Sequence, residues 1–260
     1  MDRAPARRER MSEAATAFAN YIAKLERRGA FAGEARAALL GVPVRIRHFG
    51  AYQDIVREGE RPQESCFVES GLVSRYRTLP NGSRQIVSFH LPGDMVDLQS
   101  ALVIVADHGI RTHVPTVILM IAHDDILRIA AEHPSVGRAF WFDTLVDAAI
   151  FREWTVNVGR RNTRERTAHL LLEFNARFAA IGMVRDGWFD LPVTQNDLAD
   201  ALGITPVHMN RTMQWLRGER LIRTHSRAVL IEDMAGMVAL AGFDPVYLHP
   251  EGPRSAPDGV

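Results

Sequence analysis

The sequence lacks the features that mark membrane, secreted and thiolate-metal proteins. It has 260 residues and one cysteine, Cys66, which excludes an internal disulfide and a cluster of cysteine ligands. No apolar run approaches the ~20 residues that a membrane-spanning helix needs. The first ten residues, MDRAPARRER, lack the apolar core of a signal peptide. These absences predict a cytoplasmic protein with no membrane partner.

The sequence also lacks an excess of charge of one sign. It has 31 basic and 31 acidic residues, so the net charge by itself points to no class of partner. Lys24 is the only lysine, and every other basic residue is arginine. Arginine suits bidentate contacts with phosphates and bases, but GC-rich coding produces the same bias, and we favour that explanation.

The two ends of the chain have the composition of tails. Residues 1–32 predict an N-terminal tail that leads into a helix, and residues 249–260, rich in Pro, Gly and Ser, predict a flexible C-terminal tail. Over residues 13–28, apolar side chains recur at the spacing of an amphipathic helix. These side chains are Ala15, Phe18, Tyr21, Ile22 and Leu25.

Residues 33–133 predict a β-roll, or jelly roll, that would serve as a sensor domain. A short helical segment over residues 33–40 comes first. After it, strand-like segments alternate with Gly, Pro and Asn residues, which is typical of an antiparallel β domain. These segments are Arg45–Phe49, Phe67–Glu69, Val73–Leu79, Gln85–His90 and His113–Ile121. Asn81 and Gly82 predict a type I′ hairpin turn, which needs two residues with positive φ.

Residues 134–160 predict one long helix that begins at Pro134. Its apolar residues occupy more than one side, which is more than a single contact needs. We therefore expect one side to pack on its own domain and another on the same helix of a second copy. An ordinary helix that only covers the β domain is the alternative. The expected dimer contacts are Phe140, Leu145, Ala148 and Phe151.

Residues 161–248 predict a winged helix-turn-helix domain, whose central motif begins at Thr194. Thr194 is suited to cap a first helix, with Asp197 in the position of a capping box. Gly203 supplies the left-handed residue at which that helix ends. Thr205 then caps a second helix, and Pro206 occupies its first position, where a missing N–H costs nothing.

The spacing within this motif is that of a DNA-binding pair of helices. The small Ala199 lets the helices cross closely, and Met209 fills the gap between them. Leu221–Arg223 and Ala228–Ile231 predict the two strands of the wing. We expect DNA contacts from polar and exposed residues of the motif: Thr194, Gln195, Thr205, Val207, His208, Asn210, Arg211 and Gln214.

The order of β-roll, long helix and winged helix-turn-helix resembles the Crp/Fnr family of bacterial transcription regulators. The resemblance covers residues 35–235 approximately and rests on four segments: Ile55–Glu60, Cys66–Arg75, Asn81–Asp94 and Thr194–Arg211. It implies an α+β fold in which a cyclic-nucleotide-binding-like β-roll, a long dimerisation helix and a C-terminal winged helix-turn-helix follow one another.

The resemblance also implies partners and a mode of DNA binding. A homodimer would bind a palindromic site on double-stranded DNA, with one recognition helix of each copy in a major groove, and RNA polymerase would be a protein partner. Arg211 matches the family's recognition-helix arginine, which reads a guanine. The family's usual glutamate falls on Val207, so its standard half-site cannot be assumed. His208 is as compatible with a solvated surface position as with a DNA contact.

The effector residues of the family are only partly present. In members that bind cyclic nucleotides, a Gly-Glu pair follows a Pro-Gly-Asp turn, and a later Arg-Ser or Arg-Thr pair holds the phosphate. Asp97-Leu98 stands where Gly-Glu is expected, whereas Arg111-Thr112 matches the later pair. Asp97, Arg111 and Thr112 are therefore the candidate effector-pocket residues. We expect no binding of cyclic AMP.

No cofactor and no metal are predicted, and the single cysteine does not suit the iron–sulfur version of the family. Haem or another small effector stays open, because Cys66 and an imidazole both suit iron. The histidines in question are His108, His113, His123 and His133. Hydrogen-bonded surface histidines and a buried structural Cys66 are the simpler interpretation.

The sequence contains no nucleophile–base set, phosphate loop or metal-ligand spacing, so we do not expect an enzyme. It predicts a sequence-specific DNA-binding transcription regulator with an effector other than cyclic AMP, or with none. A haem or small-molecule sensor that signals mainly through protein contacts is the alternative.

Overall fold

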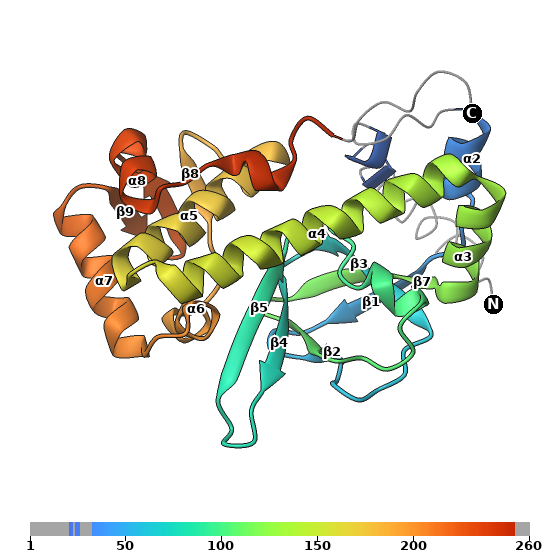
Figure 1. The fold of residues 1–260 in the computed structure, drawn as a ribbon, viewed down its shortest axis with the longest axis horizontal. Helices are drawn as coiled ribbons and strands as arrows, with labels where there is room; N and C mark the ends of the chain where they lie inside the picture. Colours follow the sequence, from blue (N-terminus) through green and yellow to red (C-terminus); the bar gives the residue numbers. More distant parts are fainter. Residues whose placement is uncertain (1–20, 23, 27–32, 253–260) are drawn as a thin grey trace, which may run out of the picture. The chain divides into compact units, whose positions relative to one another are not determined.

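The structure, a computed structural model, describes residues 21–22, 24–26 and 33–252. The described chain divides into two compact units. Unit 1 takes the residues up to Val73 together with Pro92–Asp147 and the segment from His249 onward, and unit 2 takes Ser74–Leu91 and Ala148–Leu248. Figure 1 shows the elements of both units. The sequence did not predict that residues 74–91 group with the C-terminal helices.

Unit 1 is built on antiparallel strands. The first sheet has the order β1-β7-β3, and β2 pairs with β6. Its register sets Arg45 opposite Met120 and Glu64 opposite Ala122. The strands are β1 (Arg45–Phe49), β2 (Asp54–Val56), β3 (Glu64–Ser70), β6 (Gly109–Thr112) and β7 (Thr116–Ala122). The helices are α2 (Glu34–Leu40), η1 (Leu98–Ala101) and α3 (His123–Glu132).

Two apolar clusters form the core of unit 1. One joins α2, α3 and the start of the long helix to β7, with Leu39, Leu119 and Ile129 almost fully buried. The other lies between strands and includes Val68 and Ile118. Alternate residues of a strand point to opposite faces, so β7 supplies Leu119 to one cluster and Ile118 to the other.

The predicted N-terminal helix lies mostly outside the described residues, and Ala15 and Phe18 are among those not described. The described part is helical at residues 21–22 and 24–26. Tyr21, Ile22 and Leu25 are fully buried, as the apolar spacing predicts. The ring centroids of Tyr21 and Phe67 lie 5.1 Å apart.

The strand predictions for unit 1 were incomplete. The predicted strand His113–Ile121 is in fact β7, which begins at Thr116 and follows the separate strand β6. Pro115 stands between the two strands, where its missing N–H breaks no ladder bond. The sequence does not predict β2 and β6 as separate strands, because three or four residues are too few to show an alternating pattern.

The hairpin of β4 (Val73–Thr78) and β5 (Arg84–His90) is present, but its turn is not type I′. Only Gly82 has a positive φ, of 83°, and Asn81 does not. The N–H of Gly82 donates to the carbonyl of Leu79 at 2.9 Å, so Pro80 occupies the first central position of the turn. Proline fixes φ near −65°. This geometry leaves Gly82 as the single left-handed residue after the turn.

Unit 2 combines the second half of the long helix α4 (Pro134–Arg160) with further helices, a small sheet and the β4–β5 hairpin. The sheet has the order β8-β10-β9 and is antiparallel throughout. Its strands are β8 (Trp188–Asp190), β9 (Ile222–His225) and β10 (Ala228–Ile231). The helices are α5 (Thr163–Ala180), α6 (Gln195–Leu202), α7 (Pro206–Gly218) and α8 (Met234–Ala241), followed by η2 (Pro245–Leu248). Helix α5 packs against α7 and α8.

The long helix α4 (Pro134–Arg160) has the predicted length. Among the expected dimer contacts, Phe140 is an exception, because only 7% of it is exposed and it packs in the core of unit 1. Leu145 is 46% exposed and Ala148 is half-buried. Phe151 is half-buried, and the Arg75 guanidinium lies 5.4 Å from its ring centroid. The 3.6-residue period turns Phe140 inward and leaves Leu145 outward.

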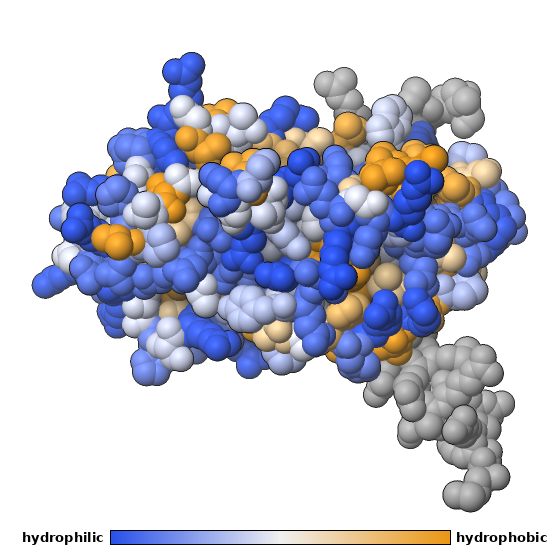
Figure 2. Space-filling view, turned by 90° about the horizontal axis from the view of Figure 1, so that it is seen from below, coloured by the Kyte–Doolittle hydropathy of each residue, from blue (hydrophilic) through white to orange (hydrophobic). Residues whose placement is uncertain are grey.

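Exposed apolar residues include the consecutive residues Leu102, Val103, Ile104 and Val105. On the face shown in Figure 2, hydrophilic residues predominate and apolar residues form separate patches. Among residues 21–22, 24–26 and 33–252, no helix combines the length and apolar composition of a membrane span.

Candidate DNA interface

Helices α6 and α7 form a helix-turn-helix whose ends are capped as predicted. The Thr194 hydroxyl accepts from the Asp197 N–H at 3.1 Å, and the Asp197 carboxylate accepts from the Thr194 N–H at 3.0 Å. Gly203 ends α6 in the left-handed conformation, with φ 63°. The Thr205 hydroxyl accepts from the His208 N–H at 3.3 Å, and Pro206 is the first residue of α7. These caps fix the angle at which α7 leaves the turn.

The contact between the two helices is small and apolar. Ala199 and Met209 have no exposed surface, and Leu202 and Leu216 are almost fully buried. The predicted roles of Ala199 as the close-crossing residue and Met209 as the filler therefore agree with their burial. A buried core of this kind holds α7 rigidly, which a base-reading helix requires.

The opposite side of α7 is exposed. Val207, His208, Asn210, Arg211 and Gln214 all lie on it. Arg211 makes no hydrogen bond or ion pair with the described residues, so its guanidinium is available to a ligand. An α-helix presented in this way fits the major groove of B-form DNA.

A row of amides crosses from α6 to α7. The Asn210 amide nitrogen donates to the Gln195 side-chain oxygen at 2.9 Å, and the Gln214 amide nitrogen donates to the Asn210 side-chain oxygen at 2.9 Å. We call Gln195, Asn210 and Gln214 the amide row. The row aligns three predicted DNA-binding residues. Thr194 and Thr205 are nearby but use their hydroxyls as helix caps.

The wing follows α7 as an exposed hairpin. Strands β9 and β10 are joined at Ser226, whose φ of 53° permits the tight turn. His225 and Arg227 are exposed at its tip, and Arg223 pairs with Glu232 at 2.7 Å. Burial of Val229 and Ile231 holds the wing on the domain.

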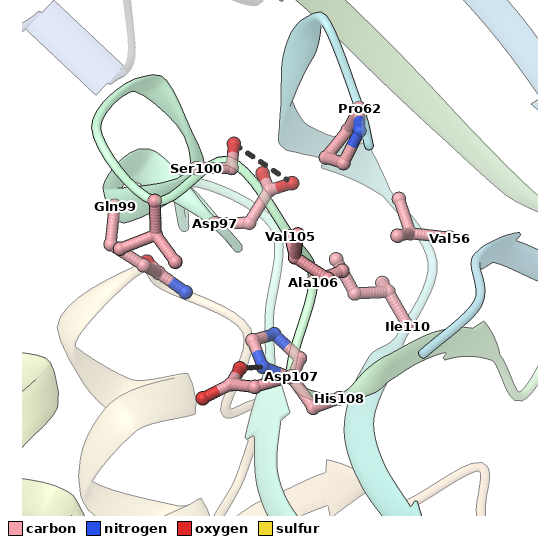
Figure 3. Close-up of a pocket in the computed structure, with 11 residues that line it drawn as sticks. Val56, Pro62, Asp97, Gln99, Ser100, Val105, Ala106, Asp107, His108 and Ile110 are labelled. Atoms are coloured by element: carbon pink, nitrogen blue, oxygen red, sulfur yellow. Dashed lines mark hydrogen bonds and ion pairs between the residues drawn. The ribbon is translucent and has the colours of Figure 1, made fainter. Parts of the chain in front are cut away.

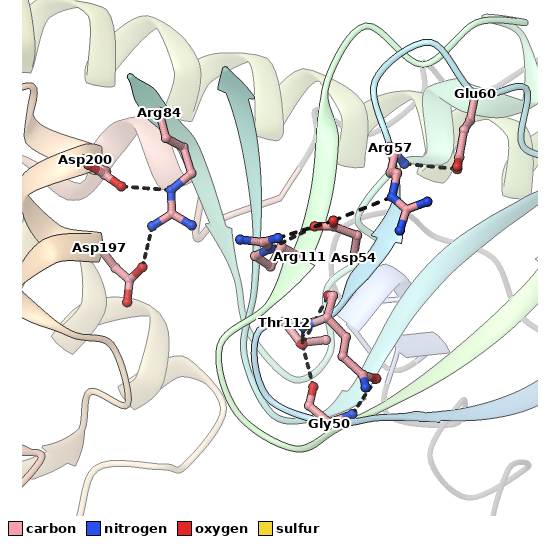
Figure 4. A network of polar contacts seen from close by, with 10 residues as sticks. Gly50, Asp54, Arg57, Glu60, Arg84, Arg111, Thr112, Asp197 and Asp200 are labelled. Carbon is pink, nitrogen blue, oxygen red and sulfur yellow. Dashed lines mark hydrogen bonds and ion pairs between the residues drawn. The ribbon is translucent and has the colours of Figure 1, made fainter. Parts of the chain in front are cut away.

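The sequence analysis missed the ionic contact that joins the β4–β5 hairpin to α6. Arg84 donates through Nη2 to Asp197 Oδ1 and through Nε to Asp200 Oδ2, both at 2.8 Å (Figure 4). Gln85 also donates to the carbonyl of Ala201 at 3.0 Å. More than 100 residues separate the partners in sequence, so no local pattern signals them. Asp197 thus takes part both in the cap of α6 and in the ion pair with Arg84.

A buried polar cluster supports α5 from within unit 2. Glu173 accepts from Trp154 Nε1 at 3.0 Å, from the Tyr247 hydroxyl at 2.8 Å and from Arg177 at 3.2 Å. Burial raises the pKa of Glu173 although these donors oppose the shift, and burial with the nearby carboxylate also raises the pKa of Tyr247. The cluster attaches η2 to α5.

A second buried group, His169, lies close to this cluster. Its ring stacks on Tyr247 with centroids 5.8 Å apart, and its Nε2 lies 3.1 Å from Glu153 Oε1. Arg161 pairs with that same oxygen at 2.8 Å. Burial, with a smaller effect from Arg161, lowers the pKa of His169 to about 3. His169 is therefore neutral near pH 7.

The three candidate effector residues do not form one site, contrary to expectation. Asp97 lines a small pocket of unit 1 near Ser100, Val105 and His108 (Figure 3), whereas Arg111 and Thr112 do not line it. The Asp97 carboxylate accepts from the Cys66 N–H at 2.6 Å. It is therefore engaged by the backbone of β3.

Arg111 is engaged by a carboxylate on the neighbouring strand. Its Nε donates to Asp54 Oδ1 at 2.8 Å, because β6 and β2 pair with these two residues opposite each other (Figure 4). The Thr112 hydroxyl donates to the Gly50 carbonyl at 2.7 Å and accepts from the Gln53 N–H at 3.0 Å. Thr112 therefore fixes a turn of the backbone.

Cys66 and the four histidines do not gather at one place. Cys66 is fully buried in β3, where burial, reinforced by Asp97, raises the pKa of its thiol. His123 Nε2 and the Ser100 hydroxyl form a hydrogen bond. The ring centroids of His113 and Tyr52 lie 5.9 Å apart. No group of three or more His, Cys, Asp or Glu side chains within the described ranges could hold a metal ion.

The fold and the exposed recognition helix define a class of protein: a DNA-binding protein with a winged helix-turn-helix and a β-roll. Two family models match the chain. A Crp-like helix-turn-helix domain matches residues 165–240, and a cyclic nucleotide-binding domain matches residues 46–133.

Relatives agree with this assignment. The transcriptional activator protein FnrL of Cereibacter sphaeroides is 27% identical over 202 residues, which cover 76% of this chain and 81% of the relative. The nitrogen fixation regulation protein FixK of Bradyrhizobium diazoefficiens is 27% identical over 196 residues, or 75% of this chain and 81% of the relative.

Solved structures share the fold. The structure of FixK2 from Bradyrhizobium japonicum has a TM-score of 0.71 at 24% identity and covers 76% of this chain and 98% of its own. The c-di-GMP responsive regulator CLP of Xanthomonas campestris has a TM-score of 0.60 at 15% identity, covering 74% and 95%. The chain belongs to the Crp/Fnr family and is a DNA-binding transcription regulator.

Proposed function

We propose that this protein regulates transcription as a homodimer that binds a palindromic DNA site through α7 of each copy. The observation that carries the proposal is the exposed side of α7, where Arg211 stands free on a helix that caps and a buried core hold rigidly. Arginine is suited to donate two hydrogen bonds to guanine O6 and N7. RNA polymerase is the protein partner that the family assignment favours, and no catalytic activity is part of the proposal.

The dimer would form along α4. Trp141, Leu145 and Ala148 follow one another at steps of four and three residues, the spacing of a helix–helix seam. Trp141 is 66% exposed and Leu145 is 46% exposed, so both side chains are available to a second copy. Two recognition helices related by a two-fold axis would then read half-sites about one helical turn apart.

Cyclic AMP is not the effector under this proposal, and no cofactor is required. The Arg111 guanidinium, which would meet a phosphate, is held by Asp54. The pocket that Asp97 lines has a cavity volume of about 20 Å³, room for one or two water molecules. Two of its side chains, Asp97 and Asp107, are carboxylates, which oppose an anionic ligand.

Selection of bound sequences from random DNA tests the proposal directly. We expect a palindrome with a guanine in each half-site, and we expect Arg211→Ala to lose the preference for it. Binding to scrambled duplex, which rests on phosphate contacts, should fall much less. Equal enrichment of all sequences, or a ratio of specific to scrambled affinity that Arg211→Ala leaves unchanged, would contradict the proposal.

A further inference from the structure

The first turn of α7 presents an apolar side chain to solvent. Val207 is the second residue of the helix and is 59% exposed. An exposed valine side chain contributes no burial energy to the free protein, and its branched β-carbon lowers its preference for a helix. The apolar residues of α7 that stabilise the domain, such as Met209 and Leu216, are buried on the opposite side.

The first turn of α7, like those of α4 and α8, carries no acidic residue. Helices α2, α3, α5 and α6 each carry an acidic residue in the first turn, where the helix dipole favours negative charge. An acidic residue at Val207 would stabilise the free helix but would accept hydrogen bonds only, as from the amino group of cytosine. Valine offers two methyl groups instead.

The neighbours of Val207 on the same side have defined roles. Arg211 lies one helical turn further along, at i+4, so the two side chains share a face. Asn210 lies between them in sequence, but its amide donates to Gln195 and accepts from Gln214. Asn210 would have to break both bonds to read an adenine with two hydrogen bonds. Of the three residues Val207, Asn210 and Arg211, Val207 and Arg211 are therefore the ones whose side chains are ready for direct contact with bases.

We propose that Val207 reads the C5-methyl group of a thymine in each half-site, next to the guanine that Arg211 reads. The thymine methyl is the apolar group that a base pair displays in the major groove. Residues four apart on a helix are separated by about 6 Å along its axis, and stacked base pairs by about 3.4 Å. The thymine therefore lies one or two base pairs from the guanine. This inference rests on the proposed DNA-binding function.

Replacement of thymine by deoxyuridine tests the contact, because it removes one methyl group and leaves base pairing intact. The selected palindrome is synthesised with deoxyuridine at one thymine position at a time, in both half-sites. For the wild-type protein we expect one position at which affinity falls about fourfold per half-site, or roughly 15-fold for the palindrome, the change that burial of one methyl group produces.

Three variants make the test specific to Val207. Val207→Ser removes both methyl groups and should bind the thymine and deoxyuridine sites equally. Val207→Thr keeps one methyl group in the same shape and should retain the preference for thymine. Val246→Ser removes an exposed valine of η2 and should discriminate as the wild type does. Melting temperatures of the four proteins control for folding.

The outcomes separate the inference from the function on which it rests. If the wild type binds thymine and deoxyuridine equally at every position near an Arg211-dependent guanine, or if Val207→Ser discriminates as the wild type does, the methyl contact is wrong and the proposed function stands. If selection yields no preferred site, the proposed function fails and the inference fails with it.

Discussion

The ion pair between Arg84 and Asp197 should stabilise unit 2 measurably. The Asp197 side chain is 2% exposed and that of Arg84 is 21% exposed, with 2.8 Å between Nη2 and Oδ1. Arg84→Gln would remove the counter-charge that Arg84 supplies to a buried carboxylate, and removal of one partner costs about 3–5 kcal/mol in fully buried pairs. Asp197 keeps the bonds from Thr194, and Arg84 is partly solvated, so we expect a loss of about 2–3 kcal/mol.

Urea unfolding followed by tryptophan fluorescence measures this loss. Three of the four tryptophans, Trp154, Trp188 and Trp215, lie in unit 2, so the signal reports mainly on the unit that contains the pair. The matched control is Arg223→Gln, which breaks an exposed pair with Glu232 within unit 2 and should cost much less, because exposed ion pairs contribute little to stability.

A double-mutant cycle identifies the source of the loss. Asp197→Asn keeps an oxygen to cap α6 but removes the charge, so Arg84→Gln in that background should cost much less than in the wild type. We expect a coupling of about 1 kcal/mol or more. Additive effects of the two substitutions, or a loss from Arg84→Gln no larger than that of the Arg223 control, would refute the assignment of a stabilising ion pair.

Three further predictions follow from the other sites. Leu145→Glu should convert the dimer to monomer in sedimentation at micromolar concentration, because it sets two like charges in the α4 seam; a wild-type monomer would contradict the seam itself. Calorimetry should detect no binding of cyclic AMP at micromolar concentration, since Asp54 already holds Arg111. His169 has its pKa lowered to about 3 when folded and about 6.5 when unfolded, so its contribution to stability is present above pH 6.5 and declines as the pH falls toward 3. His169→Phe should reduce that acid destabilisation in urea titrations at pH 4.5 and 7.5, and an unchanged difference between the two pH values would show that other groups cause it.

The sequence was sufficient for the helix-turn-helix because its signals are local. Thr194, Gly203, Thr205 and Pro206 each act within four residues of their own position, and the structure has each of them in the predicted role. For the turn of the β4–β5 hairpin, local signals in the sequence are only partly sufficient. Asn81-Gly82 predicts the position of the turn, whereas the type of turn depends on Pro80, which fixes φ at the first central position.

The sequence could not supply contacts that depend on how distant segments meet. Arg111 matched a phosphate-binding pair in the motif, yet the register between β2 and β6 sets Asp54 opposite it. Phe140 was assigned to the dimer seam because the apolar pattern of α4 is broad, and only the packing of α2, α3 and β7 against the helix shows which part of that pattern is internal.

Under the proposed function, the ion pair between Arg111 and Asp54 opposes the binding of an anionic effector at Arg111. A phosphate must displace the Asp54 carboxylate to reach the guanidinium, so one anion would exchange for another already tethered at 2.8 Å. Such an exchange yields little binding free energy unless the displaced carboxylate forms a new ion pair. Arg57 Nε already lies 3.7 Å from Asp54 Oδ2, so it is not a new partner. A neutral or cationic ligand avoids this exchange entirely. We therefore expect the β-roll to bind an anionic effector at Arg111 more weakly than a neutral or cationic one.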